Sequence, residues 1–419
     1  MAIEVRGCRV RRQNRCMEER GNMMEYGNFS FHFDSEIVFG RGTEAEAGRL
    51  VKKYGGTKAM IVYGSGSIKR SGLYSRLADS LKDAGIPFVE FGGVQPNPRR
   101  SLAEEGVRAA MAEGVDFLLG AGGGSAIDTA KAIAYGAANG GDFWQFFKGK
   151  APEKMLPVGT VITIAATGSE TSRSSVLIDD VDTNQKKGLW SSFRPRFAIM
   201  NPELTYSLPP YQAASGCVDI LSHTFMRYFS NYPSRLGDRF GEAAMRTVVE
   251  YAPICLSEPE NYGARAEVLL AGSLSHSDLM IVGRPASKAG GEHALESQLS
   301  GHYDTAHGAG LAVIMPALLK YFIFHGTEEQ VSRVARFAEG VFCVSPDAGD
   351  TSERALLGIE RFYEWLRGLG MPTTLTGLGI PAEEIPDAVS RCMKARGATI
   401  EGFMTLDEAA VTEIYEMAK

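Results

Sequence analysis

The sequence predicts two domains, an α/β domain with a parallel sheet followed by an all-helical domain. Between residues 36 and 165, short apolar runs alternate with amphipathic stretches, as in a parallel sheet that is covered by helices on both faces. After residue 206, long amphipathic stretches recur and hardly any strand signal remains. We therefore expect the α/β domain over residues 27–205 and the helical domain over residues 206–419.

Four strands and three helices are expected in the first domain. The strands are apolar runs of a length that suits a buried strand, at 58–64, 87–93, 115–124 and 157–165. The helices lie between them, at 71–85, 101–114 and 125–139. In the first helix, Leu73, Leu77 and Leu81 recur at helical spacing. The second begins with Ser101 and Glu104, which have the spacing of a capping box.

The remainder of the chain changes its pattern twice. Residues 173–205 are more irregular, with β character in "SSVLIDD" and "RFAIMNP". The second domain then contains amphipathic stretches that predict helices at 210–230, 240–256, 264–282, 288–301, 308–323, 328–343, 351–369 and 383–396.

Composition excludes several classes of function. The 419 residues carry a net charge of −6, which argues against nucleic acid or an anionic membrane as a partner. No uninterrupted apolar run approaches the length of a membrane span. The six cysteines are scattered, without a Cys-x-x-Cys pair, which favours reduced thiols in a cytoplasmic protein.

Residues 1–26 form a separate, arginine-rich segment. They contain no sustained apolar run, which argues against a secretory signal, and several acidic residues, which argue against an organelle transit peptide. We expect a disordered extension here, or an upstream start ahead of a natural one at Met23 or Met24.

A glycine-rich turn, "GAGGGSAIDTAK" (120–131), joins the third expected strand to the following helix. Glycines let the backbone approach a ligand closely, and the first amides of a helix favour a pyrophosphate. Ser125 can cap this helix and donate to a phosphate, and Asp128 can cap it as well, or bond a ribose or a nicotinamide. The alternative is a tight turn whose glycines only permit close packing, since Gly-x-Gly-x-x-Gly is absent.

A second glycine turn, "GSGSIKRSG" (64–72), follows the first expected strand. Two such turns at the carboxyl ends of parallel strands suit one extended cofactor. An NAD site usually offers a carboxylate to the adenosine ribose, but this turn contains no acid. Gly64, Ser65, Gly66, Ser67 and Lys69 instead leave room and positive charge for a 2′-phosphate. The sequence therefore predicts NADP(H) in preference to NAD(H).

A carboxylate and several histidines suggest a metal site. Asp219 and His223, in "CVDILSH", would lie one turn apart on the same helix face. His293 and His307, in "GEHALESQLSGHYDTAHGAG", can join them if one helix ends between the two and the next begins near His307. One carboxylate and three imidazoles suit a divalent cation, Fe²⁺ or Zn²⁺. The alternative is that each histidine is an ordinary surface or core residue.

With these motifs the chain resembles the iron-containing (group III) alcohol dehydrogenase family, in particular its branch of NADPH-dependent butanol dehydrogenases and aldehyde reductases. The resemblance covers about residues 27–419 and rests on the order and spacing of "FSFHFDSEIVFGRG", "GSGSIKRSG", "VQPNP", "GGGSAIDTAK", "ATGSE", "NPELTYSLPP", "GCVDILSH" and "HYDTAHGAGLAV". It implies a Rossmann-like N-terminal domain, an all-α C-terminal domain, an active site between them, and a homodimer. The implied activity is hydride transfer between NADP(H) and an aldehyde or primary alcohol.

The resemblance also assigns residues. It implies that the metal ligands are Asp219, His223, His293 and His307. It implies dinucleotide contacts at Gly64, Gly66, Ser67, Asn97, Gly123, Gly124, Ser125, Asp128, Thr163 and Thr167, and a lysine beside the cofactor at Lys186. Relatives that prefer NAD carry aspartate at the position of Gly64, which agrees with the preference for NADP(H).

One position departs from the family pattern. Members commonly carry a histidine four residues after the third ligand, near the nicotinamide, and it has been assigned proton transfer; this chain has Ser297 there. His302 could replace it only if the helix breaks first, since nine residues bring it about half a turn out of phase with His293 at ~100° per residue. Proton delivery stays unassigned, with a solvent-linked relay through the cofactor ribose and Asp128 as one option.

Two other functions are compatible with these residues. A metal-dependent hydrolase or lyase could use the four ligands to activate water, but both glycine turns would then be unexplained. A non-catalytic NADP(H)-binding protein would account for Ser297. The implied partner is a small aldehyde or alcohol, and pattern alone does not identify the physiological substrate.

Overall fold

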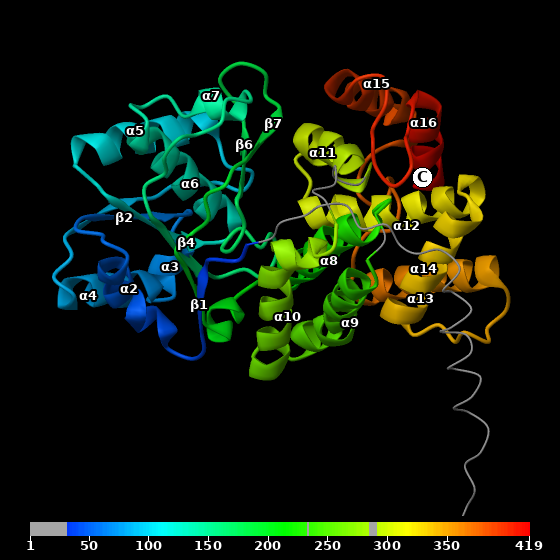
Figure 1. The fold of residues 1–419 in the computed structure, drawn as a ribbon, viewed down its shortest axis with the longest axis horizontal. Helices are drawn as coiled ribbons and strands as arrows, with labels where there is room; N and C mark the ends of the chain where they lie inside the picture. The colour runs from blue at the N-terminus through cyan, green and yellow to red at the C-terminus, as the bar shows by residue number, and fades with distance from the viewer. Residues whose placement is uncertain (1–31, 233, 285–290) are drawn as a thin grey trace, which may run out of the picture.

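The computed structural model describes residues 32–232, 234–284 and 291–419, so the extension predicted over residues 1–26 lies outside the described residues. Figure 1 shows two lobes side by side, the first built on a β-sheet and the second built of helices. The last strand of the sheet ends at Met200, and the first long helix of the second lobe begins at Pro210. The C-terminus lies among the helices of the second lobe.

The sheet of the first lobe has six parallel strands in the order β1-β8-β5-β4-β2-β3. The strands are β1 Glu36–Phe39, β2 Ala59–Tyr63, β3 Phe88–Phe91, β4 Phe117–Gly122, β5 Val158–Ile162 and β8 Phe197–Met200. β2, β4 and β5 are buried along their whole length, which explains why the sequence shows them as continuous apolar runs. All four predicted strands are present, each one to three residues shorter at its ends.

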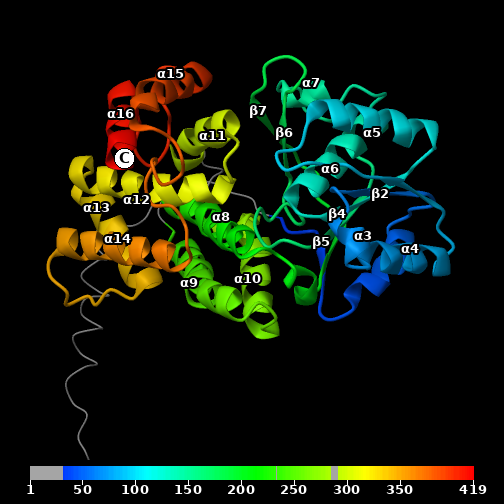
Figure 2. The ribbon, with the colours of Figure 1, turned by 180° about the vertical axis from the view of Figure 1, so that it is seen from behind.

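Helices cover both faces of the sheet. They are α2 Ala47–Lys53, α3 Ser67–Arg70, α4 Leu73–Asp83, α5 Arg100–Ala112, α6 Gly124–Ala138 and α7 Trp144–Phe147. On β2, Met60 and Val62 pack with the cluster of α5 and α6, whereas Ala59 and Ile61 pack with the cluster of α2 and α4. Figure 2 shows this division from behind, with α5 and α6 on one side of the strands and α3 and α4 on the other.

The capping box predicted for the second helix is wrong. α5 begins at Arg100, its N-cap is Arg99, and no side chain caps it. The Ser101 backbone N–H donates to Asp180 Oδ1 at 3.0 Å, and the Ser101 hydroxyl also bonds that carboxylate. Glu104 instead accepts from Arg100. A carboxylate from a distant loop has thus replaced the local cap, which sequence spacing does not reveal.

The irregular stretch after β5 contains a hairpin. It is made by β6 Ser174–Ile178 and β7 Lys186–Trp190, which pair antiparallel. The two segments with predicted β character correspond to β6 and β8. In both ribbon views the hairpin lies on the side of the first lobe that faces the helices, near α11 Gly291–Tyr303 (Figures 1 and 2). It therefore borders the junction between the two lobes.

The second lobe is a helical domain with a large apolar core. Its other helices are α8 Pro210–Tyr228, α9 Arg235–Ser257, α10 Tyr262–Ser275, α12 His307–His325, α13 Glu328–Phe342, α14 Thr351–Gly368, α15 Ile385–Arg396 and α16 Glu408–Met417. Local signals set several of their starts: Pro210 occupies the first turn of α8, and capping boxes at Thr327 and Asp350 begin α13 and α14. Each predicted helix has a counterpart among these helices and α11, but residues 288–290 of the helix predicted over residues 288–301 lie outside the described residues. α16 is not among the predictions.

The helix predicted over residues 264–282 is interrupted. α10 ends at Ser275, and a short 3₁₀ helix, η4 Asp278–Ile281, follows His276 and Ser277. The hydroxyls of Ser275 and Ser277 donate to the carbonyls of Gly272 and Leu274, each at 2.7 Å, and so compete with helix continuation. The break gives His276 a position outside regular helix.

A buried ion cluster fixes the C-terminal end of α8. Asp238, Arg284 and Arg333 are each at most 4 % exposed, and both guanidiniums bond the Asp238 carboxylate. The Arg284 guanidinium also donates to the Arg227 carbonyl at 3.1 Å, and that of Arg333 to the Tyr228 carbonyl at 3.0 Å. These carbonyls belong to the last turn of α8, so the cluster satisfies acceptors that the helix leaves free.

The substitution Asp238→Asn is expected to lower the free energy of unfolding by about 3–5 kcal/mol, because it leaves two buried guanidiniums without a counter-charge. Urea unfolding followed by circular dichroism measures the change. Glu250→Gln is the matched control, since it removes a half-exposed ion pair with Arg246 on the same helix and should barely move the midpoint. Equal midpoints for the two variants would contradict a stabilising role for the cluster.

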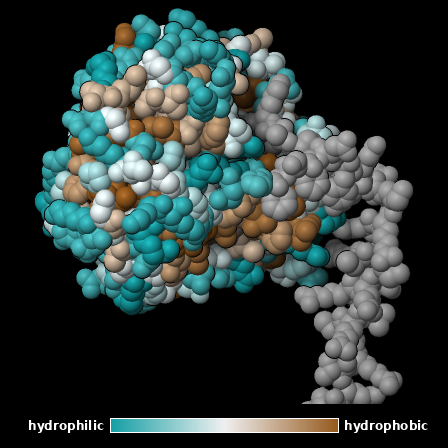
Figure 3. All heavy atoms as spheres, turned by 60° about the vertical axis from the view of Figure 1, so that its left-hand side comes forward, coloured by the Kyte–Doolittle hydropathy of each residue, from teal (hydrophilic) through white to brown (hydrophobic). Residues whose placement is uncertain are grey.

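The outer surface is mixed in character. On the face drawn in Figure 3, hydrophobic residues are scattered in small groups among hydrophilic ones. By length and composition, one helix of the described part of the chain, α12, could cross a membrane, but 72 % of it is buried inside the protein. α12 is therefore a core helix of the second lobe.

Candidate metal centre

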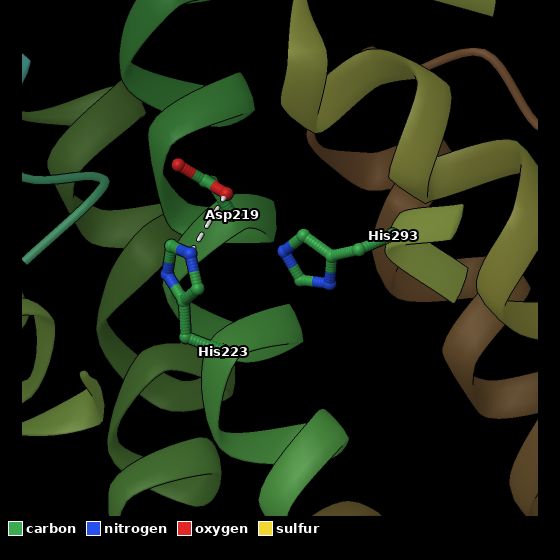
Figure 4. Close-up of side chains that lie close together, drawn as sticks. All are labelled: Asp219, His223 and His293. Carbon is green, nitrogen blue, oxygen red and sulfur yellow. Dashed lines mark ion pairs between the residues drawn. The ribbon is translucent and has the colours of Figure 1, made fainter. Parts of the chain in front are cut away.

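One turn of α8 supplies the first two predicted ligands. Asp219 and His223 are four residues apart on this helix and are both buried. His223 Nε2 lies 3.7 Å from Asp219 Oδ1, and Figure 4 shows both side chains directed toward the same point. The prediction that they share a helix face is confirmed by the structure.

Two other helices bring the remaining ligands to that point. His293 lies on α11 and His307 is the first residue of α12, because the chain turns between Tyr303 and His307. The His293 ring is 5.3 Å from the His223 ring and 5.3 Å from the His307 ring, measured between centroids. His307 Nε2 lies 3.7 Å from Asp219 Oδ1. Asp219, His223 and His293 thus converge, and His307 joins them at Asp219.

The chemistry of this cluster fits a divalent cation. One donor atom each from Asp219, His223 and His293 lies within 4.8 Å of the others. Asp219 Oδ1 and His293 Nε2 are buried without a hydrogen-bond partner among the described residues. Unpaired buried acceptors are costly, and a metal ion would satisfy these together. The residues present therefore fit a metal of the Fe²⁺ or Zn²⁺ type.

The electrostatics of the four side chains point in the same direction. Burial raises the pKa of Asp219, although His307 and His293 partly offset it. Burial, and then the neighbouring His276 and His293, hold the pKa of His223 well below its usual range. The His223 imidazole is thus neutral, and the Asp219 carboxylate is costly to ionise without a counter-charge. A metal cation would supply that charge and bind the neutral imidazole.

Two glutamates that the sequence analysis missed orient the histidines. Glu292 Oε1 is 3.0 Å from His293 Nδ1, and the Glu296 carboxylate pairs with His307 Nδ1. Both glutamates are at most 1 % exposed. Burial lowers the pKa of His307, but Glu296 and Asp219 outweigh it and the net shift is upward. Such carboxylate–histidine pairs fix the ring so that its other nitrogen faces the metal.

The substitution Glu296→Gln should therefore weaken metal binding by about 10- to 100-fold without unfolding the protein. Competition with a chromophoric chelator measures the affinity, and circular dichroism checks the fold. An unchanged affinity would show that the His307 ring does not need Glu296 for its orientation.

The alternative proton donor considered from the sequence, His302, is wrongly placed. α11 continues without a break from His293 to Tyr303, and the His302 side chain is exposed and packs edge-on against Tyr303. It therefore stays about half a turn away from His293. At the position of the missing histidine, the Ser297 hydroxyl donates to the His293 carbonyl at 2.5 Å and accepts from Arg396 Nη2 at 3.1 Å.

The two glycine turns lie at adjacent strand ends. β2 and β5 both pair with β4, so the carboxyl ends of the strands that precede Gly64, Gly123 and Thr163 are neighbours. The packing at Gly124 is close: a Cβ there would lie 2.4 Å from Thr167 Oγ1. Only glycine fits at this contact. Close packing, the alternative interpretation of the glycine-rich turn, therefore accounts for part of the glycine pattern. The arrangement remains compatible with a pyrophosphate at the start of α6.

The caps predicted for α6 are wrong. The N-cap is Gly123, no side chain caps the helix, and Ser125 lies inside it. Asp128 instead anchors a loop: its Oδ1 accepts from the Ser169 hydroxyl at 2.5 Å and its Oδ2 from the Val176 N–H at 3.0 Å. Burial raises the pKa of Asp128. Both carboxylate oxygens are thus engaged with the protein.

Two other predicted cofactor residues bridge the lobes. Lys186 on β7 donates through Nζ to Ser300 Oγ on α11, at 2.8 Å. The Asn97 amide lies 3.4 Å from Asp304 Oδ1, which follows α11, and Asn97 itself has a φ of 54°. These contacts tie the hairpin and the loop after β3 to the helix that carries His293.

The turn that suggested NADP(H) has an acidic neighbour. Lys69 Nζ lies 2.7 Å from Glu90 Oε2, and the Tyr63 hydroxyl donates to the same oxygen at 3.0 Å. The hydrogen bond with Lys69 lowers the pKa of Glu90. Glu90 lies on β3, the strand next to β2, so the sequence of the turn alone could not reveal it.

Comparison with known proteins agrees with this geometry. Residues 34–202 match the family described as iron-containing alcohol dehydrogenase, and residues 213–419 match the C-terminal domain of the Fe-containing alcohol dehydrogenase family. The chain is 33 % identical to NADH-dependent butanol dehydrogenase A of Clostridium acetobutylicum, over 93 % of this chain and 99 % of that one. It is 34 % identical to the NADPH-dependent aldehyde reductase YqhD of Escherichia coli, over 94 % and 100 %.

A solved structure shares the whole fold. The crystal structure of NADH-dependent butanol dehydrogenase A from Thermotoga maritima superposes with a TM-score of 0.87 at 37 % identity, and the match covers 94 % of this chain and 100 % of that one. The two-lobed architecture described above is therefore shared with a characterised structural class.

Proposed function

Because the chain belongs to the iron-containing alcohol dehydrogenase family, we propose that it reduces aldehydes to primary alcohols, and catalyses the reverse oxidation, with NADP(H) as its preferred dinucleotide. The chain is a metal-dependent oxidoreductase; the dinucleotide preference and the roles of individual residues are the proposal. The main support for this proposal is that Asp219, His223, His293 and His307 lie together beside the hairpin that carries Lys186.

Each group in the site has a distinct task. The four ligands would hold a divalent metal which, when bound, supplies a Lewis acid for the carbonyl oxygen, and the nicotinamide dinucleotide supplies the hydride. Glu292 and Glu296 keep two of the imidazoles in the orientation that ligation needs. Lys186 and Asn97 hold the two lobes together where the dinucleotide would lie, and so fix the distance between its reactive end and the metal centre.

Proton delivery is not assigned to any residue of this chain. The side chain at the usual donor position, Ser297, is engaged with the His293 carbonyl and with Arg396. Asp128 is a candidate for a relay, but its two oxygens hold the loop after β5 and the middle of β6. We assign Asp128 to positioning that loop, which carries Thr167.

The preference for NADP(H) depends on the balance of charge at the turn after β2. Lys69 offers a cation to a 2′-phosphate, whereas Glu90 offers a carboxylate of the kind that binds an NAD ribose. The curated relatives include enzymes described as NADH-dependent and one described as NADPH-dependent. The absence of an acid at Gly64 supports NADP(H) for this chain.

Three further points belong to the proposal. The metal is Fe²⁺ or Zn²⁺, because both accept one carboxylate and three imidazoles. The thiols of Cys217, Cys255, Cys343 and Cys392 are free, which supports a reducing, cytoplasmic location. A homodimer that takes up a small aldehyde or alcohol is what the resemblance to the family implies.

One assay tests the proposal. NADPH and NADH oxidation is followed over a panel of short and medium aldehydes, butanal included, and the metal content of the same sample is determined. We expect aldehyde-dependent loss of absorbance at 340 nm, faster with NADPH than with NADH. Turnover of an ester or a hydroxy acid without any nicotinamide would instead indicate a hydrolase or lyase. Tight NADPH binding without aldehyde-dependent oxidation would indicate a non-catalytic binding protein.

A further inference from the structure

A fourth histidine, which the motifs did not single out, lies against the metal centre. His276 follows α10, and its ring stacks on that of His223 with centroids 4.5 Å apart and an angle of 19° between planes. On the side of the hairpin, its ring centroid is 5.4 Å from that of Trp190, a residue of β7 that is 54 % exposed. His276 therefore lies between the metal ligands and the strand that carries Lys186.

The backbone contact of this histidine determines its tautomer. Nδ1 lies 2.9 Å from the Thr167 carbonyl oxygen, and a carbonyl can only accept a hydrogen bond, so Nδ1 carries the proton. The neutral ring then presents a lone pair at Nε2.

The position of the ring is tightly fixed. Gly168, in the loop that contains Thr167, has a φ of 62°, and a Cβ at Gly168 would lie 2.7 Å from His276 Cβ. The loop backbone thus packs directly on the histidine, and only glycine suits both the conformation and the contact. The ring is held by Thr167, His223 and Trp190, and none of the described residues is a hydrogen-bond partner of Nε2.

Nε2 is buried and no described residue donates to it. A buried acceptor without a donor is costly, so a ligand that brings a donor to this point gains affinity. We propose that His276 Nε2 accepts a hydrogen bond from an N–H or O–H donor of a bound reactant, and so selects reactants that carry one. This inference rests on the proposed function, because both sources of such a donor are reactants of that reaction.

Two sources share this chemistry. One is the carboxamide of the nicotinamide, which would lie near Thr167 if the predicted dinucleotide contacts hold. The other is a second hydroxyl on the substrate, as in a hydroxyaldehyde. Each source has a matched ligand without the donor: the 3-acetylpyridine analogue of NADP⁺ replaces the amide NH₂ by a methyl group, and propanal lacks the hydroxyl of 2-hydroxypropanal or 3-hydroxypropanal.

Two substitutions separate the nitrogens of the ring. In His276→Asn the side-chain amide can donate to the Thr167 carbonyl in place of Nδ1, but nothing replaces Nε2. In His276→Gln the amide oxygen reaches the position of Nε2 as an acceptor, and the contact with Thr167 is lost. If His276 accepts a hydrogen bond from a ligand, His276→Gln should keep more of the preference for donor-bearing ligands than His276→Asn. If its role is only structural, through Thr167, His276→Asn should resemble the wild type more than His276→Gln does.

The test compares donor-bearing with donor-free ligands in the wild type and in both variants. Dissociation constants for NADP⁺ and its acetylpyridine analogue come from calorimetric titration, and kcat/KM values for the three aldehydes come from NADPH oxidation. We expect the wild type to favour the donor-bearing member of one pair by roughly tenfold, His276→Asn to lose that preference, and His276→Gln to keep part of it. The pair that responds identifies the source of the donor.

Three results would overturn the inference: a wild type without preference in either pair, a preference that survives His276→Asn, or its equal loss in both variants. The first needs no variant and so stands even if the substitutions disturb folding. The titrations need no turnover, so a protein that binds NADP⁺ but reduces no aldehyde would refute the proposed function and still leave the role of His276 measurable.

Discussion

The variant His293→Ala is expected to lose its metal and, with it, at least roughly 1000-fold in kcat/KM for NADPH-dependent aldehyde reduction. Polarising the carbonyl oxygen accounts for several kcal/mol of the barrier, and each 1.4 kcal/mol corresponds to a factor of ten. The loss should be this large because His293 is the only proposed ligand on α11 and its Nε2 is otherwise unpaired among the described residues. Elemental analysis and steady-state kinetics on the same sample measure both effects.

A second histidine provides the control for this variant. His325, at the far end of α12, is 42 % exposed and pairs with Glu413 at 2.8 Å. His325→Ala should keep the wild-type metal content and the wild-type rate. If His293→Ala keeps an unchanged rate at undiminished metal content, the assignment of the metal ligands is refuted.

The variant Gly64→Asp is expected to reverse the dinucleotide preference. A carboxylate at the end of β2 would repel the 2′-phosphate of NADPH and accept from the ribose hydroxyls of NADH, a change of about 10- to 100-fold in the ratio of the two kcat/KM values. The backbone conformation of Gly64 suits the change, because its φ is not positive, but a new Cβ would lie 3.3 Å from the Val94 carbonyl oxygen, which must shift by a few tenths of an ångström. Kinetics with both dinucleotides at a fixed butanal concentration measure the ratio.

Two further variants separate charge from size at this turn. Gly64→Asn adds the same bulk without charge and should weaken both dinucleotides about equally. Glu90→Gln removes the carboxylate next to Lys69 and should raise the preference for NADPH. A wild type that already prefers NADH, and loses this preference in Glu90→Gln, would show that Glu90 and not the glycine turn determines the choice.

Much of the fold follows from local sequence. Strands such as β2 and β4 are buried on both faces and therefore appear as continuous apolar runs, and helices such as α13 begin at capping residues. Local sequence failed at two places for different reasons. At the start of α5, Asp180 from the loop after β6 replaces a local cap. After α10, the hydroxyls of Ser275 and Ser277 bond carbonyls of the preceding turn, which the amphipathic pattern does not show.

The candidate site shows the same limit. The spacing of Asp219 and His223 could be interpreted directly, because one helix carries both. Glu296 and His276 were missed because their roles depend on which helices meet: Glu296 pairs with a residue of α12, and His276 stacks on a residue of α8. Glu90 was missed for a similar reason. The order of strands in the sheet places β3 next to β2, so Glu90 reaches Lys69 in the turn after β2. The sequence pattern of one helix or strand does not show which other elements it contacts.

The most direct measurement of the central claim is a metal titration. The protein is stripped with a chelator, loaded with NADPH and butanal, and titrated with Fe²⁺ or with Zn²⁺ while NADPH oxidation is followed. If four side chains hold one cation beside the nucleotide, the stripped protein should be inactive. Activity should then rise linearly until one equivalent of metal per chain has been added. Full activity in the stripped protein, or a break at a different stoichiometry, would contradict the account.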